Sequence, residues 1–471
     1  MRFALLAAVL PACMNTPEEA RASYTDDEGD VVAELSDPFN LGCAATVNPK
    51  VVTIPSVTWH ANGVSSYVEY GRDASYGMVT PVYAGTDLNI PLYGMPGVTD
   101  VYFHAVTELA DGSVVDCSGV VTTGAVPAEI PRVVVDVNDG DWQGRGEYVF
   151  GVMFQPGQSP IPHFAGYNRD GELVWYASGD QNMVATDLQF ALDGNDILYN
   201  EYAPDWSRDP IIRRITMGGD VVREVATPLG HHMFAQLPDG TLAYNALDPR
   251  LATDPDTLEV EWIVGDAIGE VSPDGTVSSV FSVWDWLTVT SDPVLGQPSM
   301  YPQGKDWTHG NAVKYDATTG HYLLSLAHTD TVIDIDRASG VPAQMYGTVG
   351  MPVASDSLAF NYQHDPSFTE EGNLLVFTTD NLLMASGAIE YEIVDGELHE
   401  VWSHGMDGDV YAPMLGQATR LASGNTMVNY GGGAQMEEVR PDGTVVWRAR
   451  PDGQGAVFAQ MRLVDDLYAG R

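Results

Sequence analysis

The chain has 471 residues and a formal net charge of −44, with 65 Asp and Glu against 21 Lys and Arg. This length predicts two domains. The acidic charge argues against nucleic-acid binding, which needs basic side chains to neutralise phosphates. It favours solubility, for instance in a salty medium that screens the self-repulsion.

The first thirteen residues, MRFALLAAVLPAC, combine one Arg with a short apolar run and a cysteine. The run is too short to cross a bilayer as a helix and fits a bacterial signal peptide at residues 1–13. Leu10, Ala12 and Cys13 are similar to a lipobox in which Cys13 is lipidated, although Pro11 departs from that pattern. Residues 14–37 are polar and acidic, as expected of a tether. We therefore expect an exported protein, periplasmic or at the cell surface, whose membrane contact is a lipid anchor.

Short runs that alternate apolar and polar residues predict a small β-sandwich over residues 38–125. The runs VVTIPSVTWHA, SSYVEYGRD and DVYFHAVTELADG resemble strands of a fibronectin type III module, which usually serves as a spacer or interaction domain. Cys43 and Cys117 stand near the two ends of this segment. In an oxidising compartment such a pair usually forms a disulfide, and the alternative is two free buried thiols.

The sequence repeats from about residue 130 to the C-terminus, and residues 130–471 are predicted to form one domain. One repeating unit is a hairpin of two apolar strands, and its turn glycines, 47 to 65 residues apart, are Gly171, Gly219, Gly275, Gly340, Gly396 and Gly443. A second hairpin, such as AQLPDGTLAYN or FTEEGNLLVFT, alternates with the first. Six repeats of two hairpins predict an all-β fold, a six-bladed β-propeller. Only five copies of the second hairpin are clear, and either EYVFGVMF or the terminal FAQMRLVDDLY is expected to complete the last blade.

Three of the eleven histidines stand at matched places in these repeats. His232 and His364 each precede the turn glycine of their second hairpin by eight residues, and His309 heads the equivalent strand between them. Because the first strand of each blade runs along the propeller axis, we expect these imidazoles to meet at the mouth of the central channel. His231 adjoins His232 and, in a regular strand, points to the opposite face. The histidines in turns, outer hairpins and the first domain are assigned no role; they are His60, His104, His163, His321, His399 and His404.

A group of imidazoles supports two kinds of chemistry. Three imidazoles can ligate a catalytic metal ion, but the HExxH spacing is absent and the residues come from three separate repeats. Alternatively, a neutral imidazole is a nucleophile near pH 7 and a protonated one stabilises anions. We predict no cofactor and assign no metal ligand.

The segments DWTHGNAVKYD, LLSLAHTDTVIDIDRASG and YQHDPSFTEEGNLLVFTTDN occur in this order. With the closing MRLVDDLY they resemble the bacterial arylsulfate sulfotransferases over about residues 160–471. The resemblance implies a six-bladed propeller preceded by a small β-domain, and an exported enzyme. The implied reaction moves a sulfuryl group from an aryl sulfate to a phenol, without a nucleotide sulfate donor.

The resemblance also implies roles for individual residues. His364 of the QHD motif would attack sulfur and become transiently sulfated, which is covalent catalysis. His309 would hydrogen-bond the sulfate oxygens or handle the phenol proton, and His232, or else His231, would share that work. Asn311 and Trp307 flank His309 and are expected to line the pocket.

One position departs from the family pattern. Family members have an Arg two residues after the Ser of the LLSxR strand, aimed at the sulfate, whereas here Ala327 takes this place with His328 beside it. An imidazole titrates and lacks the fork of a guanidinium. If Ala327 faces the channel, His328 faces away unless the strand bulges. Two alternatives therefore stay open: a non-catalytic surface propeller that binds a ligand or protein partner, and a metal-dependent hydrolase or lyase using the same pocket.

Overall fold

The computed structural model describes residues 22–25, 31–140, 146–154, 161–290, 301–453 and 456–470. The chain separates into two compact units. The first comprises Met1–Val47, Pro55–Leu92 and Thr99–Thr123, and the second comprises Asn48–Ile54, Tyr93–Val98 and Gly124–Arg471. The predicted signal peptide, Cys13 included, lies outside the described residues. In the part that is described, no helix has the length and apolarity needed to span a bilayer.

The first unit is built around one long strand, β4, which buries alternate residues over much of its length. β4 pairs with β3, β5, β6 and β7, and register shifts at Gly63 accompany its pairing with both β6 and β7. The strands of this sheet are β3 (Ala44–Val47), β4 (Pro55–Gly71), β5 (Met78–Val79), β6 (Tyr83–Pro91), β7 (Asp100–Leu109) and β8 (Val114–Thr122). Within the predicted tether, β1 (Ala22–Thr25) pairs with β2 (Val31–Leu35). The fibronectin type III resemblance stays a prediction.

Cys43 and Cys117 form a disulfide across a sequence separation of 74 residues, so the predicted pairing is confirmed. Replacing both cysteines by Ser is expected to lower the free energy of unfolding of the first unit by about 2–4 kcal/mol, because the open chain gains conformational entropy when unfolded. Hydrogen exchange followed by mass spectrometry should show faster exchange in β7 and β8. The double Cys→Ala variant controls for the buried hydroxyls, and unchanged exchange in both variants would contradict the prediction.

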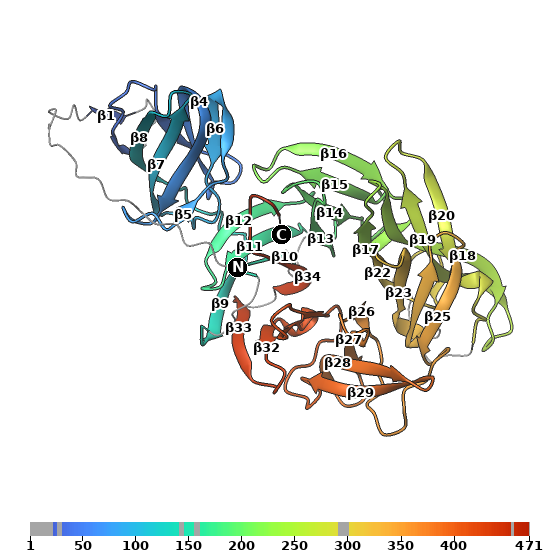
Figure 1. Cartoon of the computed structure of the whole chain (residues 1–471). Helices are drawn as coiled ribbons and strands as arrows, with labels where there is room; N and C mark the ends of the chain where they lie inside the picture. Colours follow the sequence, from blue (N-terminus) through green and yellow to red (C-terminus); the bar gives the residue numbers. More distant parts are fainter. Residues whose placement is uncertain are drawn as a thin grey trace. The chain divides into compact units, whose positions relative to one another are not determined.

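Among its described residues, the second unit contains six antiparallel sheets, which Figure 1 shows around a central opening. Each sheet has four antiparallel strands, which are named below from one edge of the sheet to the other. β9 joins the last sheet, and β21 pairs in parallel with β19 of the third. The first three sheets are β34 (Val457–Val464), β10 (Tyr148–Phe154), β11 (His163–Asn168) and β12 (Leu173–Ser178); β13 (Leu188–Phe190), β14 (Ile197–Glu201), β15 (Ile211–Ile215) and β16 (Val221–Ala226); and β17 (Gly230–Gln236), β18 (Leu242–Thr253), β19 (Val260–Val271) and β20 (Val277–Ser282), with β21 (Lys305–Asp306).

The other three sheets repeat this arrangement, and three short 3-10 helices connect strands. The sheets are β22 (Gly310–Asp316), β23 (His321–Leu326), β24 (Thr331–Asp336) and β25 (Val341–Gly347); β26 (His364–Phe368), β27 (Leu374–Asp380), β28 (Ala385–Val394) and β29 (Glu397–His404); and β30 (Gln417–Arg420), β31 (Thr426–Asn429), β32 (Met436–Val439) and β33 (Val445–Asp452), with β9 (Arg132–Asn138). The 3-10 helices are η1 (Val283–Asp285), η2 (Ala327–Thr329) and η3 (Gly431–Gly433).

The two ends of the second unit complete one sheet together. The segment EYVFGVMF forms β10, the terminal FAQMRLVDDLY contains β34, and the two strands pair from Tyr148↔Val464 to Phe154↔Val457. The sequence suggested either segment as the missing strand, and the structure uses both. The prediction of an all-β propeller is confirmed.

Tryptophans of the outer strands join neighbouring sheets. Trp175 of β12 and Trp447 of β33 are buried. Their indole N–H groups donate to the carbonyl oxygens of Met217 (2.9 Å) and Arg169 (2.8 Å), each in the adjacent sheet. The recurrent Trp after the turn glycine therefore reflects packing between blades, since a buried indole needs a hydrogen-bond acceptor.

Candidate functional site

Three inner strands, β17, β22 and β26, begin with the same backbone kink. His232, His309 and Asp365 have φ angles of 51°, 49° and 48°, in the left-handed region that non-glycine residues rarely occupy. A register shift accompanies each kink. Such bulges redirect side chains and are common beside functional sites. The kinks therefore interrupt the regular alternation of side chains where each strand starts.

The structure brings together five histidines, which we call the imidazole group: His231, His232, His309, His328 and His364. The ring centroids of His232 and His309 are 5.1 Å apart, and those of His309 and His328 are 4.6 Å apart with nearly parallel planes. His364 is buried and electrostatically coupled to His232 and His309. Residues from three blades thus share one buried place.

His231 belongs to the same group, and the prediction that it points away from His232 is wrong. The Nδ1 atoms of the two rings are 2.8 Å apart. His231 pairs with Asn245 and Phe234 with the adjacent Tyr244, so His232 and Met233 bulge out of the ladder and the alternation fails. The other nitrogen of His231, Nε2, lies 3.1 Å from Asp266 Oδ1.

Two buried carboxylates, of Asp306 and Asp266, contact the imidazole group. Asp306 Oδ2 lies 2.6 Å from His309 Nδ1. Asp266 Oδ2 accepts hydrogen bonds from the Thr308 hydroxyl (2.5 Å) and from the N–H of Gly310 (2.6 Å). Sequence reasoning assigned neither acid a role. Asp266 did carry a signal, because it interrupts the apolar run WIVGDAIGEV, where a buried acid must find partners.

The carboxylates give the imidazoles different protonation states. Burial alone would lower the pKa of His309, but the charge of Asp306 and the hydrogen bond to it outweigh burial and raise this pKa. Burial and the charge of His309 lower the pKa of His364 to about 3. Burial and the neighbouring imidazoles lower the pKa of His232 well below its usual value. Among these imidazoles, the protonated form is thus favoured for His309, and the neutral form is favoured for His232 and His364.

His328 reaches the group because its strand has ended. β23 stops at Leu326, and Ala327 and His328 lie in η2. The N–H of Ala327 donates to His309 O (3.0 Å), and the N–H of His328 donates to Thr308 O (3.1 Å). The alternation expected of a continuing strand does not apply, and the His328 ring stacks on His309.

Asn311 and Trp307 occupy different surroundings. The Asn311 amide donates to the carbonyl oxygen of Gln363, the residue before His364, at 2.8 Å. Asn311 therefore connects two of the inner strands. Trp307 packs in an apolar cluster, with its ring centroid 5.0 Å from that of Trp284. This packing accounts for its burial, and we assign it no substrate contact.

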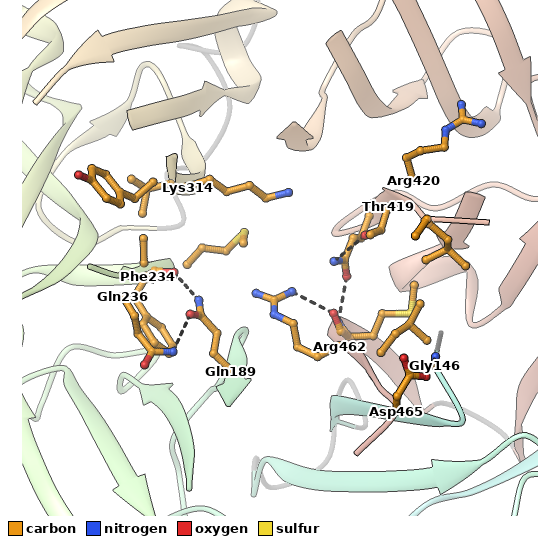
Figure 2. A pocket seen from close by; sticks show the side chains of 18 of the residues that line it. Gly146, Gln189, Phe234, Gln236, Lys314, Thr419, Arg420, Arg462 and Asp465 are labelled. Atoms are coloured by element: carbon orange, nitrogen blue, oxygen red, sulfur yellow. Dashed lines mark hydrogen bonds between the residues drawn. The ribbon is translucent and has the colours of Figure 1, made fainter. Parts of the chain in front are cut away.

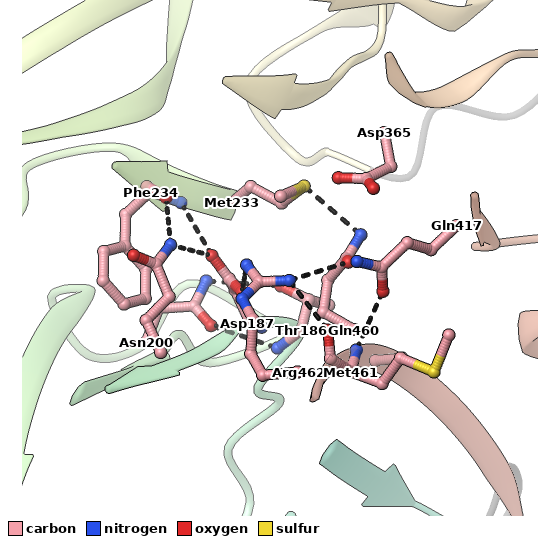
Figure 3. A network of polar contacts seen from close by, with 12 residues as sticks. Thr186, Asp187, Asn200, Met233, Phe234, Asp365, Gln417, Gln460, Met461 and Arg462 are labelled. Carbon is pink, nitrogen blue, oxygen red and sulfur yellow. Dashed lines mark hydrogen bonds and ion pairs between the residues drawn. The ribbon is translucent and has the colours of Figure 1, made fainter. Parts of the chain in front are cut away.

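A polar network that includes Thr186, Asn200 and Asp365 (Figure 3) contacts the backbone of the strands that carry the imidazoles. The carbonyl oxygen of His232 accepts hydrogen bonds from the Thr186 hydroxyl (2.6 Å) and from the Asn200 amide. Asp365, next in the chain to His364, is paired with Lys314 through a 2.9 Å contact from Nζ to Oδ1. Side chains of neighbouring blades thus contact the kinked strand heads. Such contacts stabilise backbone conformations with positive φ angles, which are unfavourable on their own.

A family model described as arylsulfotransferase (ASST) matches residues 158–462. The chain belongs to the arylsulfotransferase family. No curated protein matches it.

Solved structures that are similar to this chain share little sequence identity with it. A protein of unknown function from Bacteroides caccae is 17% identical, with a TM-score of 0.43, over 68% of this chain and 100% of its own. A streptogramin B lyase is 11% identical, with a TM-score of 0.38, over 70% and 98%. A putative 6-phosphogluconolactonase from Bacteroides fragilis is 12% identical, with a TM-score of 0.35, over 85% and 98%. We draw nothing about chemistry from these similarities.

Part of the imidazole group, together with Asp306, also fits a metal ion. Asp306, His309 and His328 each offer one ligand atom, all within 4.8 Å of one another. Two imidazoles and a carboxylate are a familiar ligand set for Zn²⁺. However, the 2.6 Å hydrogen bond between Asp306 and His309 already satisfies both groups. The same three residues can therefore act as a hydrogen-bonded acid and imidazole pair beside His328, or as ligands of a metal ion. A chelator experiment distinguishes the two.

Proposed function

We propose that this protein transfers a sulfuryl group from an aryl sulfate to a phenol through a sulfated His364, without a nucleotide sulfate donor. One observation carries the proposal: His309, whose pKa is raised by its contact with Asp306, lies beside His364, whose pKa is lowered to about 3. A nucleophile, an acid and a base are thereby available in one buried place.

In the first step, a ring nitrogen of His364 attacks the sulfur of the aryl sulfate. The bond from sulfur to the aryl oxygen breaks, and its electron pair stays on that oxygen. His309 gives the leaving oxygen a proton. Its Nδ1 is engaged by Asp306, so Nε2 is the nitrogen left to donate. A positioned acid of this kind typically contributes about 10²–10⁴-fold.

In the second step, the phenol oxygen attacks sulfur, the bond from sulfur to His364 breaks, and His232 takes the phenol proton. His232 then passes this proton to His309, whose ring centroid lies 5.1 Å from its own, and the starting protonation states return. We assign the proton of His231 to Nε2, which lies 3.1 Å from Asp266 Oδ1 without a hydrogen bond, and this leaves His231 Nδ1 as an acceptor. His232 then donates from Nδ1 across the 2.8 Å contact. Its Nε2 is left unprotonated, as a base requires.

The charge of His309 has a second use. The aryl sulfate is an anion and the protein carries a net charge of −44. At about 0.15 M salt that field decays within roughly 8 Å, so a local cation dominates inside the site. With Ala327 in place of the family Arg, protonated His309 is the group we assign to the sulfate oxygens.

The purified protein, given 4-nitrophenyl sulfate with and without phenol, tests the proposal. We expect release of nitrophenolate that depends on phenol. No release with any phenol tested would favour a non-catalytic binding propeller. Release abolished by a chelator and restored by Zn²⁺ would favour the metal ligand set of Asp306, His309 and His328.

The acid side of the pH profile gives a sharper test. An imidazole of ordinary pKa, near 6.5, loses its neutral form on acidification, and its rate of sulfation would fall about 30-fold between neutral pH and pH 5. His364, with a pKa lowered to about 3, stays neutral over this range. We expect the single-turnover rate of enzyme sulfation not to fall from pH 7.5 to 5, because His364 stays neutral and acidification favours the protonated form of His309. A decline with a midpoint near pH 6.5 would contradict the lowered pKa.

We also propose that the protein acts outside the cytoplasm, attached through Cys13. The disulfide between Cys43 and Cys117 supports an oxidising compartment. Metabolic labelling with a radioactive fatty acid should mark the wild type and not the Cys13→Ser variant. Equal labelling of both would refute the lipid attachment.

A further inference from the structure

The second unit holds a separate cavity of about 920 Å³. Its walls come from five inner strands, β13, β17, β22, β30 and β34, and from nearby turns (Figure 2). None of its lining residues belongs to the imidazole group. This volume lies within the range of small-molecule sites, which combine apolar walls with a few polar groups.

Two ion pairs in the wall have the same orientation. Lys314 pairs with Asp365 at 2.9 Å and Arg462 pairs with Asp187 at 2.7 Å. The side chains of Lys314 and Arg462 are 30% and 24% exposed, whereas both carboxylates are fully buried. Figure 2 shows Lys314 and Arg462 reaching towards the middle of the cavity from different sides. Each pair therefore turns its positive end to the cavity and keeps its negative end inside the wall.

The other polar groups of the cavity are already engaged. The Gln189 amide donates to Asp187 Oδ2 (2.8 Å) and to Phe234 O (2.6 Å). Asp465 accepts from the N–H of Gly146, and Asp466 accepts from the N–H of Tyr468. These hydrogen bonds offset part of the negative charge of the two acids. The ammonium and guanidinium groups are thus the charges best placed to meet a ligand.

Apolar side chains complete the walls. Phe234, Val313, Leu421, Met461 and Leu463 line the same cavity as the two cations. Val313, Phe234 and Met461 are buried, so Leu463 and the edge of Leu421 are the apolar surfaces left for a ligand. A small inorganic anion would fill little of the volume of about 920 Å³, whereas an organic anion can contact Leu463 while its charge meets the cations.

Three of the chain's 21 Lys and Arg residues line this cavity: Lys314, Arg420 and Arg462. Arg420 pairs with Glu390, and the other two, paired with fully buried acids, are the cations assigned to a ligand.

We propose that this cavity binds an organic anion with an aromatic or apolar body, of the aryl sulfonate, sulfate or carboxylate class. Lys314 and Arg462 would meet the acidic group, and Leu463 would contact the ring. The site is distinct from the imidazole group and does not depend on the proposed sulfuryl transfer.

Calorimetric titration of the full-length protein tests this proposal. The probe is 4-nitrobenzenesulfonate, an aryl anion without a transferable sulfate ester, and 4-nitrobenzamide is its neutral counterpart. Ala422 lines the cavity and is exposed, so a larger side chain there removes no buried contact. Ala422→Glu adds a repulsive charge, and Ala422→Gln is a matched neutral control. We expect Ala422→Glu to weaken sulfonate binding about tenfold and Ala422→Gln to leave it unchanged.

A second variant tests independently whether the sulfonate binds in this cavity. Lys314→Met should weaken sulfonate binding at least as strongly as Ala422→Glu, and 4-nitrobenzamide should not bind detectably. The proposal is overturned if the wild type does not bind the sulfonate at millimolar concentration. It is also overturned if Ala422→Glu and Ala422→Gln bind it equally, or if the neutral amide binds as well. Because binding is measured without turnover, these outcomes are separate from a failure of the proposed transfer reaction.

Discussion

The His364→Ala variant is expected to lose sulfuryl transfer by a factor on the order of 10⁴ while remaining folded. The reason is that the side chain itself receives the sulfuryl group, so its removal deletes a bond-forming atom. The measurement is phenol-dependent release of nitrophenolate from 4-nitrophenyl sulfate, with thermal unfolding followed in parallel.

A matched variant controls for the loss of any histidine. His321 of β23 also contacts a carboxylate, Asp334, at 2.7 Å, but lies outside the imidazole group. His321→Ala is expected to keep the wild-type rate. If His364→Ala keeps a rate within an order of magnitude of the wild type, His364 does not carry the sulfuryl group.

The Asp306→Asn variant is expected to lower kcat/KM by about 100- to 1,000-fold. Without the carboxylate, burial is left as the dominant influence on His309, and burial lowers its pKa. His309 would then be neutral near pH 7 and could neither protonate the leaving oxygen nor offer a positive charge. Steady-state kinetics at pH 7 measure kcat/KM.

The choice of leaving group separates this role from a loss of structure. Phenolate is more basic than 4-nitrophenolate and needs the proton from His309 more strongly. The loss in Asp306→Asn should therefore be larger with phenyl sulfate than with 4-nitrophenyl sulfate. Equal losses of rate with the two substrates would indicate that Asp306→Asn disturbs the structure. The Asp334→Asn variant is the control and is expected to keep the wild-type rate with both substrates. That variant breaks a comparable contact, between Asp334 of β24 and His321 of β23.

The propeller could be predicted because its signals are local. Turn glycines and apolar runs mark each hairpin, and their period reveals the repeat. The register of His232 and His364 relative to their turns indicated which residues stand at the strand heads. The pairing of β10 with β34 was visible only as two candidate segments, because the contact joins residues about 300 positions apart.

Other features of the site depend on contacts that the sequence does not display. The place of His231 follows from a bulge that a regular alternation cannot predict. His328 joins the group because β23 ends one residue before Ala327. Tyr301, whose hydroxyl lies 3.3 Å from His231 Nδ1, is buried in the site, and no motif pointed to it. Trp307 looked like a pocket residue beside His309, yet its ring packs against Trp284.

Mass spectrometry of the protein after brief incubation with 4-nitrophenyl sulfate, without a phenol, tests the central claim most directly. After an alkaline quench and proteolysis, we predict one added SO₃ group on the peptide that contains His364, and its loss when phenol is added before the quench. Phenol-dependent turnover with no SO₃ on that peptide, or with SO₃ on another residue, would contradict the account.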